Sequence, residues 1–210
     1  MRKRLFCAAV AAALLSGGCA GPAIPPSMPE IVPVEAWGGS PPPGGAAPQR
    51  LTQITLHHQG ETWIEGSDVA AYLRRLQQWS RQTRHWADIP YHYVIDPEGR
   101  IYAARPIELA GDTNTEYDPR GHALVMVLGN FEEVRPRPAQ LRAIVELMAG
   151  LAARHGLAPT AIASHKDFSS QTVCPGRHLY PYVESGWIRR AVAARLAGER
   201  TLPPLLPPLP

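Results

Sequence analysis

Apolar residues recur at helical spacing in three parts of the chain. Ser67 can cap a helix whose apolar positions are Val69, Tyr72, Leu73, Leu76 and Trp79. We interpret this stripe as core, not as a functional surface. A second helix is predicted from Pro138 to Gly156, with one face formed by Leu141, Ile144, Val145, Met148 and Leu151. A third is expected over about Glu184 to Leu196, with its inward positions at Trp187, Ile188 and Val192.

Shorter runs rich in β-branched and aromatic residues predict strands between these helices. The runs are residues 51–58, 91–96, 101–104, 122–128 and 160–164. The turn at 97–100 makes the second and third a hairpin, and the almost continuously apolar run 122–128 is typical of a buried central strand. Because strands and helices are interspersed, we expect an α/β fold with a central mixed β-sheet flanked by helices.

The N-terminal residues 1–19 have the pattern of an export signal. A basic start, Arg2 to Arg4, is followed by an apolar stretch and by the small residues before Cys19. This pattern resembles a bacterial lipoprotein signal, which implies an exported protein in the periplasm, anchored to the outer membrane by a lipid on Cys19. The resemblance is imperfect because Ser16 stands three residues before the cysteine, where leucine is usual. Cleavage by an ordinary signal peptidase near Ala20 and a buried N-terminal helix are the alternatives.

Composition divides the remainder of the chain into three parts. Residues 20–49 are rich in Pro, Gly and Ala, which predicts an extended linker without a core of its own. Residues 50–200 have the length of one domain and form the predicted folded unit. The tail, residues 201–210, alternates Pro and Leu, so we expect no regular structure there, although its leucines can lie on the domain surface.

Charge and cysteine content narrow the function. The net charge is only +3, and no basic patch is interleaved with aromatic residues, so nothing indicates nucleic acid as a partner. Cys7 lies in the signal, which leaves Cys174 as the only thiol of the exported domain if Cys19 is lipidated. A single thiol in an oxidising compartment is explained by metal ligation or by burial as a structural residue. We expect a monomer by default.

Two candidate zinc ligands lie in one short segment. His165 and Cys174 are nine residues apart, and Pro175-Gly176 behind the cysteine favours a turn that holds the sulfur in place. A catalytic zinc site needs three protein ligands and an open position. The strand 51–58 ends in His57 and His58 and is the best source of the third ligand. Strand alternation places these two histidines on opposite faces, and it leaves open which face holds the metal.

Five segments in order resemble one family. They are Ile54 to His58, Trp86-Ala87-Asp88-Ile89-Pro90-Tyr91-His92-Tyr93, the hairpin Gly99 to Arg105, Leu128 to Phe131, and His165 with Cys174-Pro175-Gly176. In this order they are similar to the zinc-dependent N-acetylmuramoyl-L-alanine amidases, which include the phage lysozyme-type amidases and the peptidoglycan recognition proteins. The resemblance covers roughly Leu51 to Tyr182.

The resemblance implies a role for several residues. His57, His165 and Cys174 would hold Zn²⁺, Tyr91 corresponds to the catalytic tyrosine, and Thr172 occupies the position two before the cysteine. Two departures matter. The His-to-Cys interval is one residue longer than expected, which can displace Thr172. Residues 108–112 lack a histidine that often stands there in relatives.

The implied activity is hydrolysis of the amide bond between N-acetylmuramic acid and L-alanine in peptidoglycan by zinc-activated water. Tyr91 would donate a hydrogen bond to the oxyanion, and Thr172 would add a second or orient the water. The leaving amine needs a proton, and His58 and His92 are candidates to supply it, although we favour structural histidines bonded to backbone. Asp88 and Asp167 are interpreted either as groups that orient a ligand or as turn or capping residues. The alternatives are a non-catalytic peptidoglycan-binding module and a structural zinc site closed by a fourth ligand, His58 or His178.

Overall fold

The computed structural model describes residues 26–44 and 47–208. The predicted signal, with Cys7 and Cys19, lies outside these residues. In the part of the chain that is described, no helix has the length and apolar character needed to cross a membrane.

A five-stranded mixed sheet forms the centre of the fold, in the order β3-β2-β4-β1-β5. The strands are β1 (Gln53–His58), β2 (Tyr93–Ile95), β3 (Ile101–Ala103), β4 (His122–Val127) and β5 (Ile162–Ser164). β1 pairs in parallel with β4 on one side and with β5 on the other, β2 is parallel to β4, and only β3 is antiparallel to its neighbour. The predicted mixed sheet is confirmed, and all of β4 is buried as its apolar sequence indicated.

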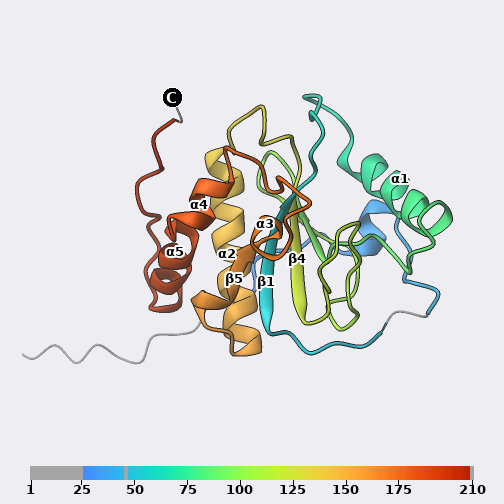
Figure 1. Ribbon diagram of the computed structural model, residues 1–210, viewed down its shortest axis with the longest axis horizontal. Helices are drawn as coiled ribbons and strands as arrows, with labels where there is room; N and C mark the ends of the chain where they lie inside the picture. The colour runs from blue at the N-terminus through green and yellow to red at the C-terminus, as the bar shows by residue number, and fades with distance from the viewer. Residues whose placement is uncertain (1–25, 45–46, 209–210) are drawn as a thin grey trace, which may run out of the picture.

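Helices cover both faces of the sheet (Figure 1). On one face lies α1 (Val69–Gln82), and on the other lie α2 (Pro138–His155), α4 (Tyr180–Glu184) and α5 (Trp187–Leu196). Strand alternation divides the core accordingly: Val125 and Val127 belong to the cluster with α2 and α5, whereas Met126 belongs to the cluster with α1. The predicted flanking of the sheet by helices is therefore confirmed.

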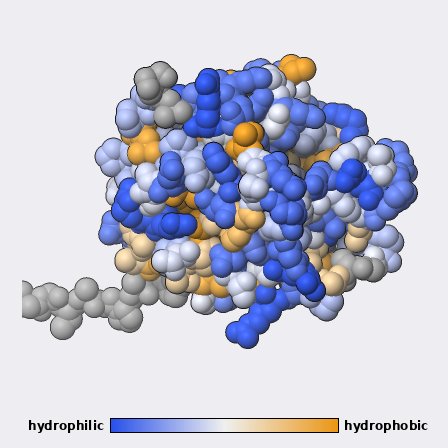
Figure 2. Space-filling model, in the orientation of Figure 1, coloured by the Kyte–Doolittle hydropathy of each residue, from blue (hydrophilic) through white to orange (hydrophobic). Residues whose placement is uncertain are grey.

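Two short helical elements precede and follow the last strand. They are the 3₁₀ turn η2 (Pro159–Ala161) and the single-turn helix α3 (His165–Phe168). On the face of the molecule shown in Figure 2, hydrophilic side chains cover most of the surface and apolar ones form separated patches. Most large apolar side chains of the described residues lie inside the two clusters instead.

Helix termini differ from the sequence prediction at two places. Asp68, not Ser67, caps α1, because its carboxylate accepts a hydrogen bond from the Ala71 amide at 3.1 Å. The helix expected over about Glu184 to Leu196 is α5, which begins three residues later at Trp187, and a separate short helix, α4, ends at Glu184 before Gly186. This glycine has φ 73°, a left-handed conformation that interrupts the helical backbone. α2 begins at Pro138 and is followed by Gly156 as predicted.

The linker predicted for residues 20–49 is wrong over residues 26–44. This segment contains a 3₁₀ turn, η1 (Val34–Trp37), and Trp37 is 1% exposed in the cluster beside α1. The Trp37 indole Nε1 donates to the Ala103 carbonyl at 2.7 Å, and the Val32 amide donates to Ile101 at 2.8 Å. Prolines restrict the unfolded backbone and so reduce the entropic cost of ordering this segment. The Trp37 side chain alone buries a large apolar surface, which compensates for the small number of other apolar side chains.

The C-terminal tail agrees with its prediction. Residues 202–208 form no helix or strand, and Leu202 and Leu206 pack against the cluster that contains α5. The Trp187 indole Nε1 donates to the Pro204 carbonyl at 2.8 Å, which fixes the tail on the domain surface.

We predict that Trp37→Ala lowers the free energy of unfolding by about 3–5 kcal/mol, because it empties a buried aromatic site. Trp79→Ala is the matched control, since Trp79 is 43% exposed, and its effect should be much smaller. Urea unfolding followed by circular dichroism measures both variants. Equal midpoints for the two would show that the N-terminal segment adds no stability.

Candidate metal centre

Parallel strand pairing brings two of the candidate ligands together. β1 and β5 are in register with Leu56 opposite Ser164, so the residues that follow, His57 and His165, lie side by side at the carboxyl ends of their strands. Their ring centroids are 4.6 Å apart. His57 is still within β1, whereas His165 is the first residue of α3.

Cys174 reaches the same point from the loop that follows α3. Its Sγ lies 3.8 Å from Nδ1 of His57 and accepts a hydrogen bond from the His58 amide at 3.3 Å. Gly176 allows the loop to come this close, because a Cβ there would lie 2.5 Å from the Phe131 carbonyl carbon, and its φ is +96°. The sulfur is therefore held by contacts with the end of β1 and with the segment after β4.

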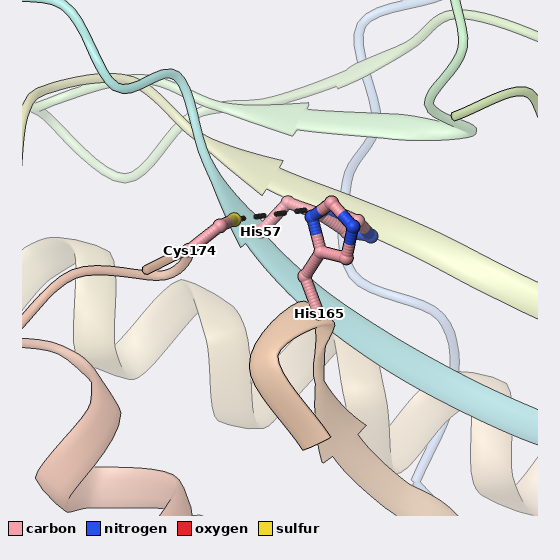
Figure 3. A group of neighbouring side chains, drawn as sticks. All are labelled: His57, His165 and Cys174. Atoms are coloured by element: carbon pink, nitrogen blue, oxygen red, sulfur yellow. Dashed lines mark hydrogen bonds between the residues drawn. The ribbon is translucent and has the colours of Figure 1, made fainter. Parts of the chain in front are cut away.

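The three side chains form one buried cluster (Figure 3). Ligand atoms of His57, His165 and Cys174 all lie within 4.8 Å of one another. Among the described residues, this is the one group of His, Cys, Asp or Glu side chains with a spacing that can hold a metal ion, and it contains no fourth member. Such a set is typical of an open site and not of a closed structural one.

The electrostatics of the cluster suit a soft divalent cation. Burial lowers the pKa of His57 well below its usual value, and the neighbouring His165 charge lowers it further. Burial also lowers the pKa of His165 to about 4, so both rings are neutral at pH 7, as metal ligands must be. Burial raises the pKa of Cys174 to about 12, a penalty on the thiolate that a bound cation offsets. Two imidazoles and one thiolate fit zinc.

The two predicted catalytic residues lie in different positions relative to the cluster. Tyr91 is half-buried with its ring centroid 5.2 Å from that of His57, and burial raises its pKa well above its usual value, so its hydroxyl keeps its proton. Thr172 Oγ1 accepts a hydrogen bond from the Cys174 amide at 3.0 Å, which closes the turn before the cysteine. The structure thus brings Tyr91 to the ligands and gives Thr172 a contact with the loop that carries one of them.

The other histidines are engaged with the backbone. His58 Nδ1 accepts from the Phe131 amide at 3.3 Å, and His92 Nδ1 accepts from the Leu124 amide at 2.9 Å. Both rings thus have the backbone contacts expected of structural histidines. His58 therefore points away from the position of a fourth ligand.

Both aspartates singled out in the sequence have capping or turn roles. Asp167 accepts hydrogen bonds from the amide and hydroxyl of Ser164 at 2.7 and 2.8 Å, and so caps α3 directly behind His165. Asp88 is buried and accepts from the Ile89 amide at 2.8 Å and from the Gln77 side chain at 2.9 Å. Neither carboxylate has a hydrogen bond to a candidate ligand side chain.

Sequence reasoning missed the loop between β3 and β4. Thr115 Oγ1 lies 2.7 Å from Nε2 of His165, and the Tyr117 hydroxyl lies 3.5 Å from Nε2 of His57. In the sequence these residues belong to a polar loop without a recognisable motif. The aromatic residue Tyr117 is the one local signal that this loop packs against the domain.

A cavity of about 560 Å³ lies beside Tyr91. Its lining comes from the segment after β1, from α1 and from the segment before β2, and includes Tyr72, Arg75, Leu76, Trp79 and Trp86. The prediction that the whole α1 stripe is core is therefore wrong for its outer positions. Val69 and Leu73 are buried, but Trp79 is largely exposed in the cavity wall.

Comparison with known proteins identifies the family. The model for N-acetylmuramoyl-L-alanine amidases matches residues 47–177. The chain belongs to this family. The matched range contains all three candidate metal ligands and Tyr91.

Individual relatives include both amidases and recognition proteins. The chain is 27% identical over 194 residues to the N-acetylmuramoyl-L-alanine amidase of Sus scrofa, covering 85% of this chain and 32% of that protein. It is 26% identical over 135 residues to peptidoglycan recognition protein 1 of Mus musculus, covering 63% of this chain and 73% of that one. The chain thus spans about a third of the length of the curated amidase it matches.

Solved structures share the mixed α/β fold. Drosophila peptidoglycan recognition protein SD superposes with a TM-score of 0.66 at 26% identity, over 74% of this chain and 93% of that one. The amidase LysC of Clostridium intestinale superposes with a TM-score of 0.61 at 24% identity, over 80% of this chain and 98% of that one. The fold shared with this chain therefore covers more than nine-tenths of each of these two structures.

We predict that Zn²⁺ at 100 times its dissociation constant raises the free energy of unfolding by about 2.7 kcal/mol, because it binds only the folded protein. Cys174→Ala should lose most of this gain, whereas His178→Ala, outside the cluster, should keep it. Thermal unfolding with and without Zn²⁺ measures the difference. The same stabilisation in Cys174→Ala would exclude Cys174 as a ligand.

Proposed function

We propose that the chain is a zinc-dependent hydrolase that cleaves the amide bond between N-acetylmuramic acid and L-alanine in peptidoglycan, acting as a monomer. The observation that carries this proposal is the buried group of His57, His165 and Cys174, with ligand atoms within 4.8 Å of one another, beside Tyr91 and its cavity. Membership of the amidase family supports the substrate class.

The three clustered side chains would hold the zinc ion. When bound in such a site, zinc polarises a carbonyl group and lowers the pKa of water toward about 7. The chain's own contribution is to keep both imidazoles neutral through burial and to hold the Cys174 sulfur against the end of β1 through the His58 amide.

Tyr91 and Thr172 are proposed to act on the reacting amide. Tyr91 stays protonated, so it can donate a hydrogen bond to the carbonyl oxygen as negative charge develops there. Thr172 Oγ1 already accepts from the Cys174 amide, which leaves its O–H as a second donor. Because His58 Nδ1 and both ring nitrogens of His92 contact backbone groups, we give neither residue a catalytic role.

The cavity beside Tyr91 is proposed to bind the part of the substrate that does not react. Trp79 and Trp86 supply aromatic surface for sugar or peptide, and Arg75 and Glu61 supply charges of both signs for a zwitterionic peptide. A related solved structure, at 25% identity and a TM-score of 0.65, is described as tracheal cytotoxin bound to peptidoglycan recognition proteins LCa and LCx.

Recognition of peptidoglycan without cleavage is the second candidate function. It is favoured by the relatives that are named as recognition proteins. The complete set of three ligand candidates together with Tyr91 favours the enzyme, because a binding module needs neither a metal nor a hydrogen-bond donor beside it.

We predict that Tyr91→Phe lowers kcat for muropeptide cleavage by about 100- to 1,000-fold and leaves zinc affinity unchanged, because it removes one donor to the oxyanion. Release of free glycan is followed by mass spectrometry with the zinc-loaded full-length chain. Tyr72→Phe is the matched control for kcat, since Tyr72 lines the cavity and does not contact the clustered ligands, so any effect of this variant should be on KM.

Two further variants separate the enzyme from the binding module. Cys174→Ser should lose zinc and activity together, and Trp79→Ala should raise KM with little change in kcat because it removes only cavity surface. Tight peptidoglycan binding without cleavage by the zinc-loaded wild type would overturn the enzyme proposal and support recognition.

We further propose that the protein is exported to the periplasm and anchored to the outer membrane through a lipid on Cys19. The folded segment begins by residue 26, so the chain between the anchor and the domain reaches at most about 25 Å. Such a reach would keep the domain next to the membrane and limit it to the adjacent peptidoglycan.

We predict that a clickable fatty acid labels the full-length chain in a bacterial host and that Cys19→Ala abolishes the label. Cys7→Ala is the matched control and should remain labelled, because Cys7 lies in the part removed with the signal. A label that persists in Cys19→Ala, or none in the wild type, would contradict lipidation at this residue.

A further inference from the structure

We propose that Thr115 and Tyr117 are positioning residues of the metal centre. Their hydroxyl oxygens accept the Nε2 protons of His165 and His57, and so leave Nδ1 of each ring as the metal-binding atom. The inference rests on the proposed zinc site and extends it to the loop between β3 and β4.

The contact with His165 is short and leaves only one ring nitrogen for the cluster. Thr115 Oγ1 lies 2.7 Å from Nε2 of His165. A neutral imidazole has one N–H and one lone pair. With Nε2 bonded to Thr115, Nδ1 is the nitrogen that remains to face the other ligands.

Thr113 offers an acceptor for the Thr115 hydroxyl proton. The Thr115 amide donates to Thr113 Oγ1 at 3.1 Å, and the two hydroxyl oxygens are 2.9 Å apart. If Thr115 donates its hydroxyl proton to Thr113, its lone pairs are directed at His165. The hydrogen bonds then run in one direction, from His165 to Thr115 to Thr113.

The two nitrogens of His57 face different partners. Nδ1 lies 3.8 Å from the Cys174 sulfur, on the side of the cluster, whereas Nε2 lies 3.5 Å from the Tyr117 hydroxyl. The Tyr117 ring is held in place by packing, with its centroid 5.1 Å from that of His165 and stacked on Phe168 at 5.8 Å. Both histidines therefore present Nε2 to the loop and Nδ1 to the cluster.

Glu116 ties this loop to the segment that carries His165. Its Oε2 accepts from the Ser169 hydroxyl at 2.5 Å, and its Oε1 accepts from the Ser170 amide at 3.1 Å. Ser169 directly follows α3, so these hydrogen bonds link the loop to the end of the helix that begins with His165. The hydroxyls of residues 115 and 117 are thereby kept within reach of both rings.

Hydrogen-bond partners of this kind typically change metal affinity by 10- to 100-fold, because they set the tautomer and the orientation of the ring. We expect Thr115→Val to lower zinc affinity within this range and Thr115→Ser, which keeps the hydroxyl, to restore most of it. Tyr117→Phe should have a smaller effect, since its contact is longer. Thr62→Val is the matched control, because the Thr62 hydroxyl bonds to the exposed Glu133.

The tautomers can be measured directly in the metal-free full-length protein by long-range ¹H–¹⁵N NMR of the imidazole rings. We expect His165 to carry its proton on Nε2 in the wild type and to become a tautomer mixture in Thr115→Val. Zinc affinity is measured by competition with a chromophoric chelator, and the unfolding midpoint of each metal-free variant shows that it is folded.

A wild-type His165 protonated on Nδ1, or a folded Thr115→Val that binds zinc as tightly as the wild type, would overturn the inference. These results are distinct from a failure of the proposed function. If the wild type is active and Thr115→Val has unchanged zinc affinity, the positioning role is wrong and the proposed enzymatic function stands. A fixed Nε2 tautomer with Thr115-dependent zinc affinity but no cleavage leaves the positioning role and removes the enzyme.

Discussion

Parallel pairing of β1 with both β4 and β5 is the constraint on which the candidate metal centre depends. It places the ends of β1 and β5 next to each other, and so brings His57 beside a histidine more than one hundred positions later in the sequence. The pairing is stabilised from both faces, because Ile54 and Leu56 are fully buried against α2 and α5 and Met126 is buried against α1. A residue at the end of such a strand has little freedom to move, which suits a ligand that must be held in place before the metal binds.

The same burial that fixes the ligands makes them costly to leave without partners. Moving a polar atom out of water costs free energy unless the atom forms a hydrogen bond in the protein. Here the outer nitrogens of His165 and His57 face Thr115 and Tyr117, and the Cys174 sulfur receives the His58 amide. One ligand atom from each of the three side chains lies within 4.8 Å of the other two. The hydrogen bonds from the surrounding loops therefore set the orientation of the ligand side chains within the cluster.

Local sequence signals predicted the elements with regular periodicity and the residues that stand at their ends. β1, β4 and α2 follow from their apolar patterns, and Pro138 and Gly156 mark the limits of α2 correctly. The grouping of His57, His165 and Cys174 followed from the order of family motifs, and the structure brings these three side chains together. Composition failed for residues 26–44, because the burial of Trp37 depends on contacts with α1 and β3 that composition does not reveal.

Periodicity also failed to separate core from cavity on α1. A helical stripe shows which face of a helix is apolar, but whether a sheet or an open cavity lies opposite depends on the neighbouring segments. Val69 and Leu73 face Val94 and Met126, whereas Trp79 extends beyond the sheet and lines the cavity with Trp86. The loop residues 115 and 117 were missed for the same reason, since their contacts are fifty and sixty positions away in sequence.

The three candidate ligands differ in how their positions are maintained. His57 is fixed by pairing with Met126 of β4, directly after the last residue of β1 that pairs with β5, and His165 is fixed by the Asp167 cap at the start of α3. Cys174 has no regular element around it and depends on the Thr172 turn and on the close approach of Gly176 to Phe131. Two tertiary hydrogen bonds add to these turn contacts, because the Cys174 sulfur accepts from the His58 amide at 3.3 Å and the Cys174 carbonyl accepts from the Lys166 amide at 2.9 Å. The sulfur therefore reaches the centre through loop contacts, whereas the sheet and α3 place the two imidazoles.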